Sequence, residues 1–205
     1  VQSNWLSASG GYFSDPTVGV VQSPQAHRDW SQSTLSRMMN WEYDGFFRIG
    51  MHHRQERDAA IQHGTMTLIR AAALRGVGGW DTGSICEDTE LGLRLLRQGL
   101  RVIYVDQVLG TGLVPSDFAA YQRQRRRWAQ GAMQILRRHR GALLGRSPLR
   151  LAQRYHFVAG WLPWLGDALH LGFSVVAIGW TLGVLTAPQI FGLPTPLFVT
   201  PLIVF

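Results

Sequence analysis

Residues 84–105 read SICEDTELGLRLLRQGLRVIYV. Ser84 is followed three residues later by Glu87, which is the pattern of a capping box, so a helix is expected to begin here. Gly99 is expected to end it, because glycine adopts the left-handed backbone of a helix end without strain. Residues 102–105 are β-branched or aromatic and predict a strand. A helix followed at once by a strand is typical of an α/β domain.

The same alternation of short elements continues on both sides of this stretch. Buried strands are predicted at residues 18–22 and 64–69. Helices are predicted at residues 29–60, 70–74 and 116–139. The sequence therefore predicts the fold class α/β for a domain over residues 1–147.

Charge divides the chain into two parts. The net charge is +7, and all 20 basic residues are arginines that lie between Arg28 and Arg154. From residue 155 to the end, Asp167 is the one charged residue. Loops on the cytoplasmic side of a membrane are enriched in basic residues, so this pattern fits a cytoplasmic domain that ends in a lipid bilayer. The single cysteine, Cys86, excludes an internal disulfide and agrees with a reducing compartment.

The carboxy-terminal part is predicted to contact the membrane in two ways. Residues 148–167 mix arginine with aromatic residues, as an amphipathic helix at the membrane interface does. Residues 168–205 are predicted to be a transmembrane region with one span and the start of a second at 197–205. The uncharged run 169–187 would reach roughly 29 Å as a helix, close to the thickness of a hydrocarbon core.

An acidic cluster opens the helix that follows Ser84. Glu87 and Asp88 stand in its first turn, where the helix dipole favours anions. One interpretation is a capped acidic turn with no further role. The other is that one of these carboxylates is a general base for a hydroxyl nucleophile.

A basic and aromatic cluster lies on the helix predicted at 116–139. Helical spacing places Gln124, Arg127 and Trp128 on one face, and Tyr121 extends that face by one turn. A guanidinium suits a diphosphate and an indole suits a sugar ring. Two alternatives are a solvated basic face with one core tryptophan, and a nucleic-acid-binding helix over residues 123–127. The arginine-free, tryptophan-containing tail argues against nucleic acid as a partner.

Together the two clusters resemble the family-two processive glycosyltransferases, which include cellulose, chitin, hyaluronan and β-glucan synthases. The family pattern is Thr-Glu-Asp followed by Gln-x-x-Arg-Trp, and this chain has Cys86 in place of the threonine. The resemblance implies the C-terminal half of a GT-A type nucleotide-sugar transferase domain. It also implies that Asp88 is the catalytic base, with Glu87 beside it.

The resemblance assigns further residues and a metal. Gln124, Arg127 and Trp128 would line the acceptor and nucleotide-diphosphate site, and Gly64 and Thr65 would lie by the acceptor. The family holds Mg²⁺ or Mn²⁺ with an upstream Asp-x-Asp motif, which does not occur in this sequence. Both ends are interpreted as cut points, the metal ligands are expected outside the chain, and the chain alone is expected to be inactive. His52, His53 and His63 are not assigned as ligands.

Within the family, residues 46–51 and 62–67 look most similar to bacterial β-1,3-glucan synthases. The resemblance therefore implies UDP-glucose as donor, a growing β-glucan as glycan acceptor, and the bacterial inner (plasma) membrane as location, with the catalytic part cytoplasmic. Alternatives are a chitin, hyaluronan or cellulose type synthase, and a single-transfer enzyme with a lipid acceptor. The complete motif at 124–128 favours a polymerising enzyme.

Overall fold

Three strands form the central sheet in the order β3-β1-β4. In this computed structural model, which describes residues 1–191, β1 (Val18–Gln22) is buried along its whole length. It pairs antiparallel with β3 (Thr67–Ile69) and parallel with β4 (Arg101–Tyr104). Two short strands, β2 (Ala26–His27) and β5 (Thr111–Gly112), form a second, parallel pair. The parallel β1 and β4, joined by helices, confirm the predicted α/β class.

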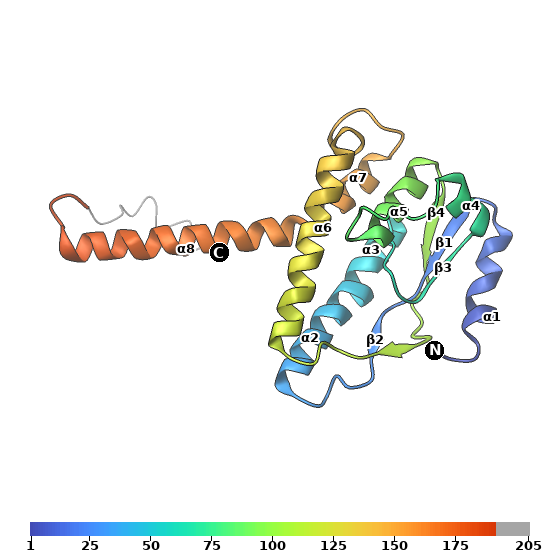
Figure 1. The fold of residues 1–205 in the computed structure, drawn as a ribbon, viewed down its shortest axis with the longest axis horizontal. Helices are drawn as coiled ribbons and strands as arrows, with labels where there is room; N and C mark the ends of the chain where they lie inside the picture. Colours follow the sequence, from blue (N-terminus) through green and yellow to red (C-terminus); the bar gives the residue numbers. More distant parts are fainter. Residues whose placement is uncertain (192–205) are drawn as a thin grey trace. The chain divides into compact units, whose positions relative to one another are not determined.

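The chain divides into two compact units, Val1–Trp161 and Leu162–Phe205. In Figure 1 the sheet of the first unit lies between α1 on its right and the longer helices α2 and α6 on its left. Its helices are α1 (Trp5–Gly10), a 3-10 turn η1 (Gly11–Ser14), α2 (Thr34–Asp44), a π-helical segment η2 (Gly45–Met51), α3 (His52–Glu56), α4 (Ala71–Gly76), α5 (Glu87–Arg97), α6 (Phe118–Leu144) and α7 (Leu151–Ala159).

Several predicted elements agree with the structure and others change length. The strand at 18–22 is confirmed, and the strand predicted at 102–105 is β4. The strand predicted at 64–69 is shorter, because residues 64–66 form a loop before β3. The helix predicted at 29–60 is three segments, α2, η2 and α3. The helix predicted at 116–139 continues to Leu144, with non-helical backbone at His139.

The predicted capping box at Ser84 is wrong. Helix α5 begins at Glu87 with Cys86 at its N-cap and without a capping side chain in the described part of the chain. A serine cap at position 84 would accept the Glu87 N–H. Within the first turn of α5, the Asp88 carboxylate accepts the Thr89 N–H at 2.7 Å. Ser84 Oγ is buried and has no hydrogen-bond partner among residues 1–191.

Helix α7 covers part of the segment predicted to lie at the membrane interface. Gln153 and Phe157 are buried in the first unit. Contact of this segment with a membrane stays a prediction.

The second unit contains α8 (Leu162–Thr186), which is long and apolar enough to cross a membrane. This helix includes most of the predicted span at 169–187. The further apolar segment predicted at 197–205 lies outside the described residues.

Candidate active site

Asp88 lies in the first turn of α5 and is more enclosed than Glu87. Asp88 is half-buried, whereas Glu87 is exposed. Burial raises the pKa of the Asp88 carboxyl above its ordinary value, and backbone hydrogen bonds, including those from Thr89 and Gly64, oppose this rise. A carboxylate with a raised pKa is the stronger base once it is ionised. The environment of Asp88 therefore suits proton abstraction better than that of Glu87.

The loop with Gly64 and Thr65 lies directly against this carboxylate. A Cβ atom at position 64 would lie 3.0 Å from Asp88 Oδ2, which is closer than ordinary packing allows. Glycine therefore lets the loop backbone approach the acid. Gly64 and Thr65 are exposed, so a ligand can reach the loop from solvent. The structure thus brings together the predicted base and the two residues predicted to lie by the acceptor.

Helix α5 packs directly on Gln62, which lies two residues before Gly64. Thr89 Oγ1 donates a hydrogen bond to the carbonyl of Gln62 at 3.2 Å. One turn later, a Cβ on Gly92 would lie 2.8 Å from Gln62 Cβ, so only glycine fits at this contact. The first turns of α5 and the start of the loop are therefore one packed unit.

The amino-terminal half of α6 carries the second predicted cluster. Gln124 and Trp128 are half-buried and face Tyr43 of α2. The Tyr43 hydroxyl donates to Gln124 Oε1 at 3.5 Å, and the Tyr43 and Trp128 rings meet edge to face with centroids 6.0 Å apart. Arg127 is exposed. The Tyr121 hydroxyl donates to Glu42 Oε2 at 3.0 Å, so this group is already engaged.

Arg125 is the residue of this helix that the sequence analysis missed. Its side chain is 13% exposed and pairs with Glu42 at 2.7 Å. Its guanidinium lies over the Trp128 ring at 4.4 Å and over the Tyr121 ring at 4.7 Å. The spacing of Tyr121, Arg125 and Trp128, four and then three residues, is the signal that could have revealed this stack. Arg125 therefore orients Trp128 and fixes α6 to α2.

Cys86 joins the two clusters at the start of α5. A Cβ on Gly131 of α6 would lie 2.3 Å from Cys86 Sγ, so the thiol occupies the space that a side chain there would need. Burial raises the pKa of this thiol to about 11; the charges of Asp88 and Glu87 add to the rise and Arg127 opposes it. The charges of the acidic turn and of Arg127 thus both act on the half-buried thiol of Cys86.

The three histidines that were not assigned as ligands, His52, His53 and His63, have different partners. His53 Nδ1 is 3.7 Å from Glu56 Oε2. His52 Nε2 is 2.8 Å from Asp106 Oδ2. The His63 ring packs edge to face on Phe46 and Phe47, and burial, aided by Arg54, lowers its pKa to about 4. Among residues 1–191, His, Cys, Asp and Glu side chains form no group of three that could hold a metal ion.

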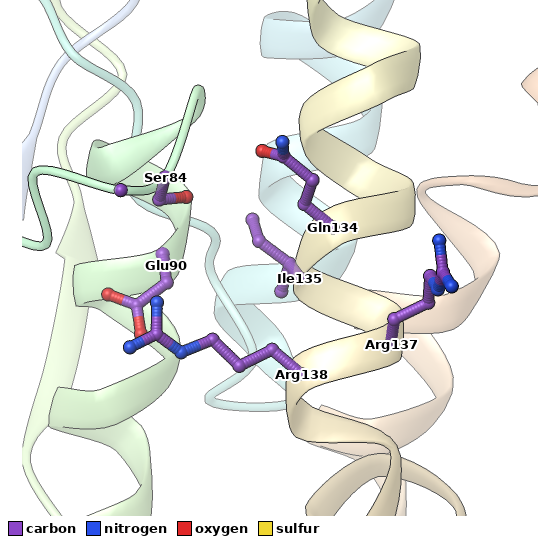
Figure 2. A pocket seen from close by; sticks show the side chains of 7 residues that line it. Ser84, Glu90, Gln134, Ile135, Arg137 and Arg138 are labelled. Carbon is purple, nitrogen blue, oxygen red and sulfur yellow. The ribbon is translucent and has the colours of Figure 1, made fainter.

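A pocket of about 420 Å³ lies between α5 and the second half of α6 (Figure 2). It is lined by Gly83, Ser84, Glu90, Gln134, Ile135, Arg137 and Arg138. Both carboxylate oxygens of Glu90 are engaged, at 2.7 Å by Arg94 Nε and at 2.9 Å by His139 Nε2. This pocket shares no residue with the predicted site.

Comparison with known proteins gives one family. A family model described as glycosyl transferase family group 2 matches residues 7–203. Cellulose synthase 2 of Novacetimonas hansenii is 31% identical over 156 residues, which cover 73% of this chain and 10% of that protein. The UDP-forming cellulose synthase catalytic subunit of Xanthomonas axonopodis pv. citri is 30% identical over 177 residues, covering 83% and 23%.

Two further similarities widen the range of relatives. A probable glucomannan 4-beta-mannosyltransferase 7 of Oryza sativa subsp. japonica is 27% identical over 145 residues, covering 70% of this chain and 25% of that protein. The chain thus spans a quarter or less of these three curated relatives. Among solved structures, the mannosyltransferase PcManGT from Pyrobaculum calidifontis, in complex with GDP-Man and Mn²⁺, matches with a TM-score of 0.51 and 19% identity over 90% of this chain and 52% of that chain. The family match and this neighbour confirm the α/β fold of GT-A type.

Proposed function

Because this chain belongs to glycosyl transferase family group 2, we propose that it supplies the acceptor and base half of a membrane-bound, inverting, processive glycosyltransferase. The proposed reaction transfers glucose from UDP-glucose to a growing β-glucan. The observation that supports it best is the half-buried carboxylate of Asp88, which lies against the exposed Gly64 loop. A base enclosed beside an open loop is the arrangement that deprotonation of an acceptor hydroxyl requires.

In this mechanism Asp88 accepts the proton of the acceptor hydroxyl. The hydroxyl oxygen forms the new glycosidic bond at the anomeric carbon, and the bond to the diphosphate breaks on the opposite face, which inverts the configuration. The leaving nucleoside diphosphate takes the bonding electron pair. The exposed guanidinium of Arg127 is available to offset its charge, an electrostatic contribution of the kind that dominates many enzymes.

The remaining predicted residues position the acceptor. Trp128 offers an indole ring whose orientation is fixed by Arg125 and Tyr43. Gln124 lies one turn earlier on the same face. Gly64 and Thr65 border the carboxylate and leave room for a sugar. We assign acceptor contact to these four residues.

The proposal assigns no divalent-metal ligand to the residues of this chain. The described residues do not fit such an ion, since no group of three potential ligands forms among residues 1–191. The family resemblance implies that Mg²⁺ or Mn²⁺ is held by an upstream motif, and this stays an expectation. No step above depends on it.

The choice of donor rests on the relatives. Two of them are named as cellulose synthases, one of these as UDP-forming, and this supports UDP-glucose. A relative named as a glucomannan 4-beta-mannosyltransferase favours mannose as the second candidate. The product predicted from residues 46–51 and 62–67 is a β-1,3-glucan.

The choice of donor by the complete protein tests this proposal. Membranes that contain it are incubated in turn with radiolabelled UDP-glucose, GDP-mannose and UDP-N-acetylglucosamine, and the polymer is subjected to linkage analysis. Incorporation of glucose in β-1,3 linkage is expected. Incorporation of mannose would establish the second candidate, and incorporation of N-acetylglucosamine would move the enzyme to the chitin or hyaluronan type.

The location is proposed from the second unit. Helix α8 is long and apolar enough to span a bilayer. With the arginine-rich part before it, this supports a bacterial inner membrane protein whose catalytic part is cytoplasmic. Recovery of the complete protein in the soluble fraction without detergent would contradict this placement.

A further inference from the structure

Gln22 is a fully buried polar residue at the carboxyl end of β1. Its side chain forms hydrogen bonds with the loop at residues 63–67. Its amide nitrogen donates to the carbonyls of Ser23 at 2.8 Å, Thr65 at 2.8 Å and Met66 at 3.3 Å. Its amide oxygen accepts from His63 N–H at 2.9 Å and from Thr67 Oγ1 at 2.6 Å. One side chain therefore contacts both ends of the 63–67 loop.

Apart from Gln22, this loop is held by the Ser23 N–H, which donates to Met66 O at 2.8 Å, and by the Thr67 hydroxyl, which lies 2.5 Å from His63 O. Regular pairing between β1 and β3 starts only at the Gln22–Thr67 pair, so residues 63–66 lie beyond the ladder. Met66 has a φ of 55°, which a non-glycine residue adopts only when its surroundings hold it there. The Gln22 amide adds four hydrogen bonds to residues 63–67, more than any other side chain in this region gives them. A fully engaged buried amide of this kind fixes a single geometry.

The loop shaped by Gln22 is the one that covers the proposed base. Gly64 lies in its middle, with its backbone against Asp88 Oδ2. If the loop moved away, water would reach the Asp88 carboxylate and would take the place of the Gly64 N–H as a hydrogen-bond donor. Burial is the largest contribution to the raised pKa of Asp88, and a water molecule can replace the lost hydrogen bond. The pKa of Asp88 would therefore fall toward its ordinary value.

We propose that Gln22 is a positioning residue for the general base, acting through the 63–67 loop to keep Gly64 against Asp88. This inference rests on the proposed function, in which Asp88 removes the acceptor proton. Gln22 does not touch the carboxylate itself. Its role is to fix the backbone that does, and small displacements of such support lower the rate of the chemical step.

The test compares Gln22→Met with Arg70→Met in the complete protein. Arg70 serves as control because it also ties backbone to β1 by three hydrogen bonds, to Val18 O at 2.9 Å, Phe13 O at 2.8 Å and Asp15 O at 2.7 Å. It does so at the opposite end of the strand. Both variants should lower the melting temperature. Only Gln22→Met should lower kcat, by about 10- to 10²-fold, and move the acid limb of the kcat profile to lower pH.

A milder variant keeps the test open if Gln22→Met does not fold. Thr67→Val removes the hydroxyl that contacts the amide oxygen at 2.6 Å and the His63 carbonyl at 2.5 Å, and it should shift kcat and its acid limb in the same direction by a smaller amount. A kcat and pH profile in which Gln22→Met and Thr67→Val match Arg70→Met would overturn the inference. Asp88→Asn, assayed in parallel, separates the two hypotheses: if it keeps normal turnover, the proposed base itself is wrong.

Discussion

Asp88 and Glu90 are two carboxylates of one helix turn with opposite surroundings. Asp88 is half-buried beside an exposed loop. Glu90 is 1% exposed, and Arg94 and His139 engage both of its oxygens. Arg94 also donates to the carbonyls of Val77 at 2.6 Å and Gly79 at 2.8 Å, so this cluster ties α5 to residues 77–79, which follow α4. The difference teaches that packing partners, and not residue type, decide which acid is available for chemistry and which holds the fold.

Replacing the available carboxylate should give the largest effect on activity. Asp88→Asn keeps the shape of the side chain but removes the proton acceptor, so kcat of the complete protein should fall ~10²- to 10⁴-fold. Donor affinity and melting temperature should change little. Glu87→Gln is the matched control, because Glu87 is the exposed neighbour and should keep turnover. Were the two variants to exchange behaviour, Glu87 would be the base.

Replacing the enclosed carboxylate should instead affect stability. Glu90→Ala leaves Arg94 without its buried partner, and breaking a buried ion pair costs about 3–5 kcal/mol in the free energy of unfolding. Denaturant unfolding measures the change. Glu87→Ala, at an exposed position, should stay within about 0.5 kcal/mol of the parent. An unchanged unfolding midpoint for Glu90→Ala would show that the pair does not hold the fold.

The junction between the two helices gives a smaller expected effect. Gly131→Ala places a methyl group where Cys86 Sγ lies, 2.3 Å away, and such overpacking typically costs about 1–3 kcal/mol. Gly141→Ala is the control on the same helix, because its Cβ would meet nothing within 4 Å. That variant should gain about 0.5–1 kcal/mol from helix propensity. Adding Cys86→Ala should recover part of the loss in Gly131→Ala; no recovery would contradict the contact.

The smallest expected effect is a shift in the pH at which kcat falls. Because burial raises the pKa of Asp88, the carboxylate takes up its proton at a higher pH than an exposed aspartate does. A protonated base cannot accept the acceptor proton, so kcat should fall as pH is lowered through this raised pKa. His63, with a pKa of about 4, stays neutral above that value. Measured kcat that follows an ordinary aspartate pKa would contradict the enclosure of Asp88.

Local pattern predicted the elements and much of the candidate site. The strand at 18–22, helix α5 and helix α6 follow from hydrophobic spacing and from turn residues. The family resemblance predicted Gly64 by the acceptor and Asp88 as the base, and the structure places these two residues in contact. The roles assigned to Gln124, Arg127 and Trp128 stay predictions.

What the sequence missed depends on contacts between distant segments. The stack of Arg125 depends on Glu42 of another helix, and four of the five hydrogen bonds of Gln22 depend on the 63–67 loop, more than 40 residues away in the sequence. The capping box at Ser84 failed because α5 begins at Glu87 with Cys86 at its N-cap, so Ser84 lies two residues before the cap. The residue at which a helix starts within such a stretch is not visible in residue spacing.

The contact between Gly92 and Gln62 has a consequence for how a polymer could grow. With no side chain at Gly92, helix and loop touch through backbone and Cβ atoms, and Thr89 and Gly64 add two more contacts to the same joint. Such close packing prevents the helix from moving against the loop. In the proposed reaction the base and the loop beside it would therefore move as one unit, and after each transfer the lengthened chain must advance by one sugar to present a fresh hydroxyl.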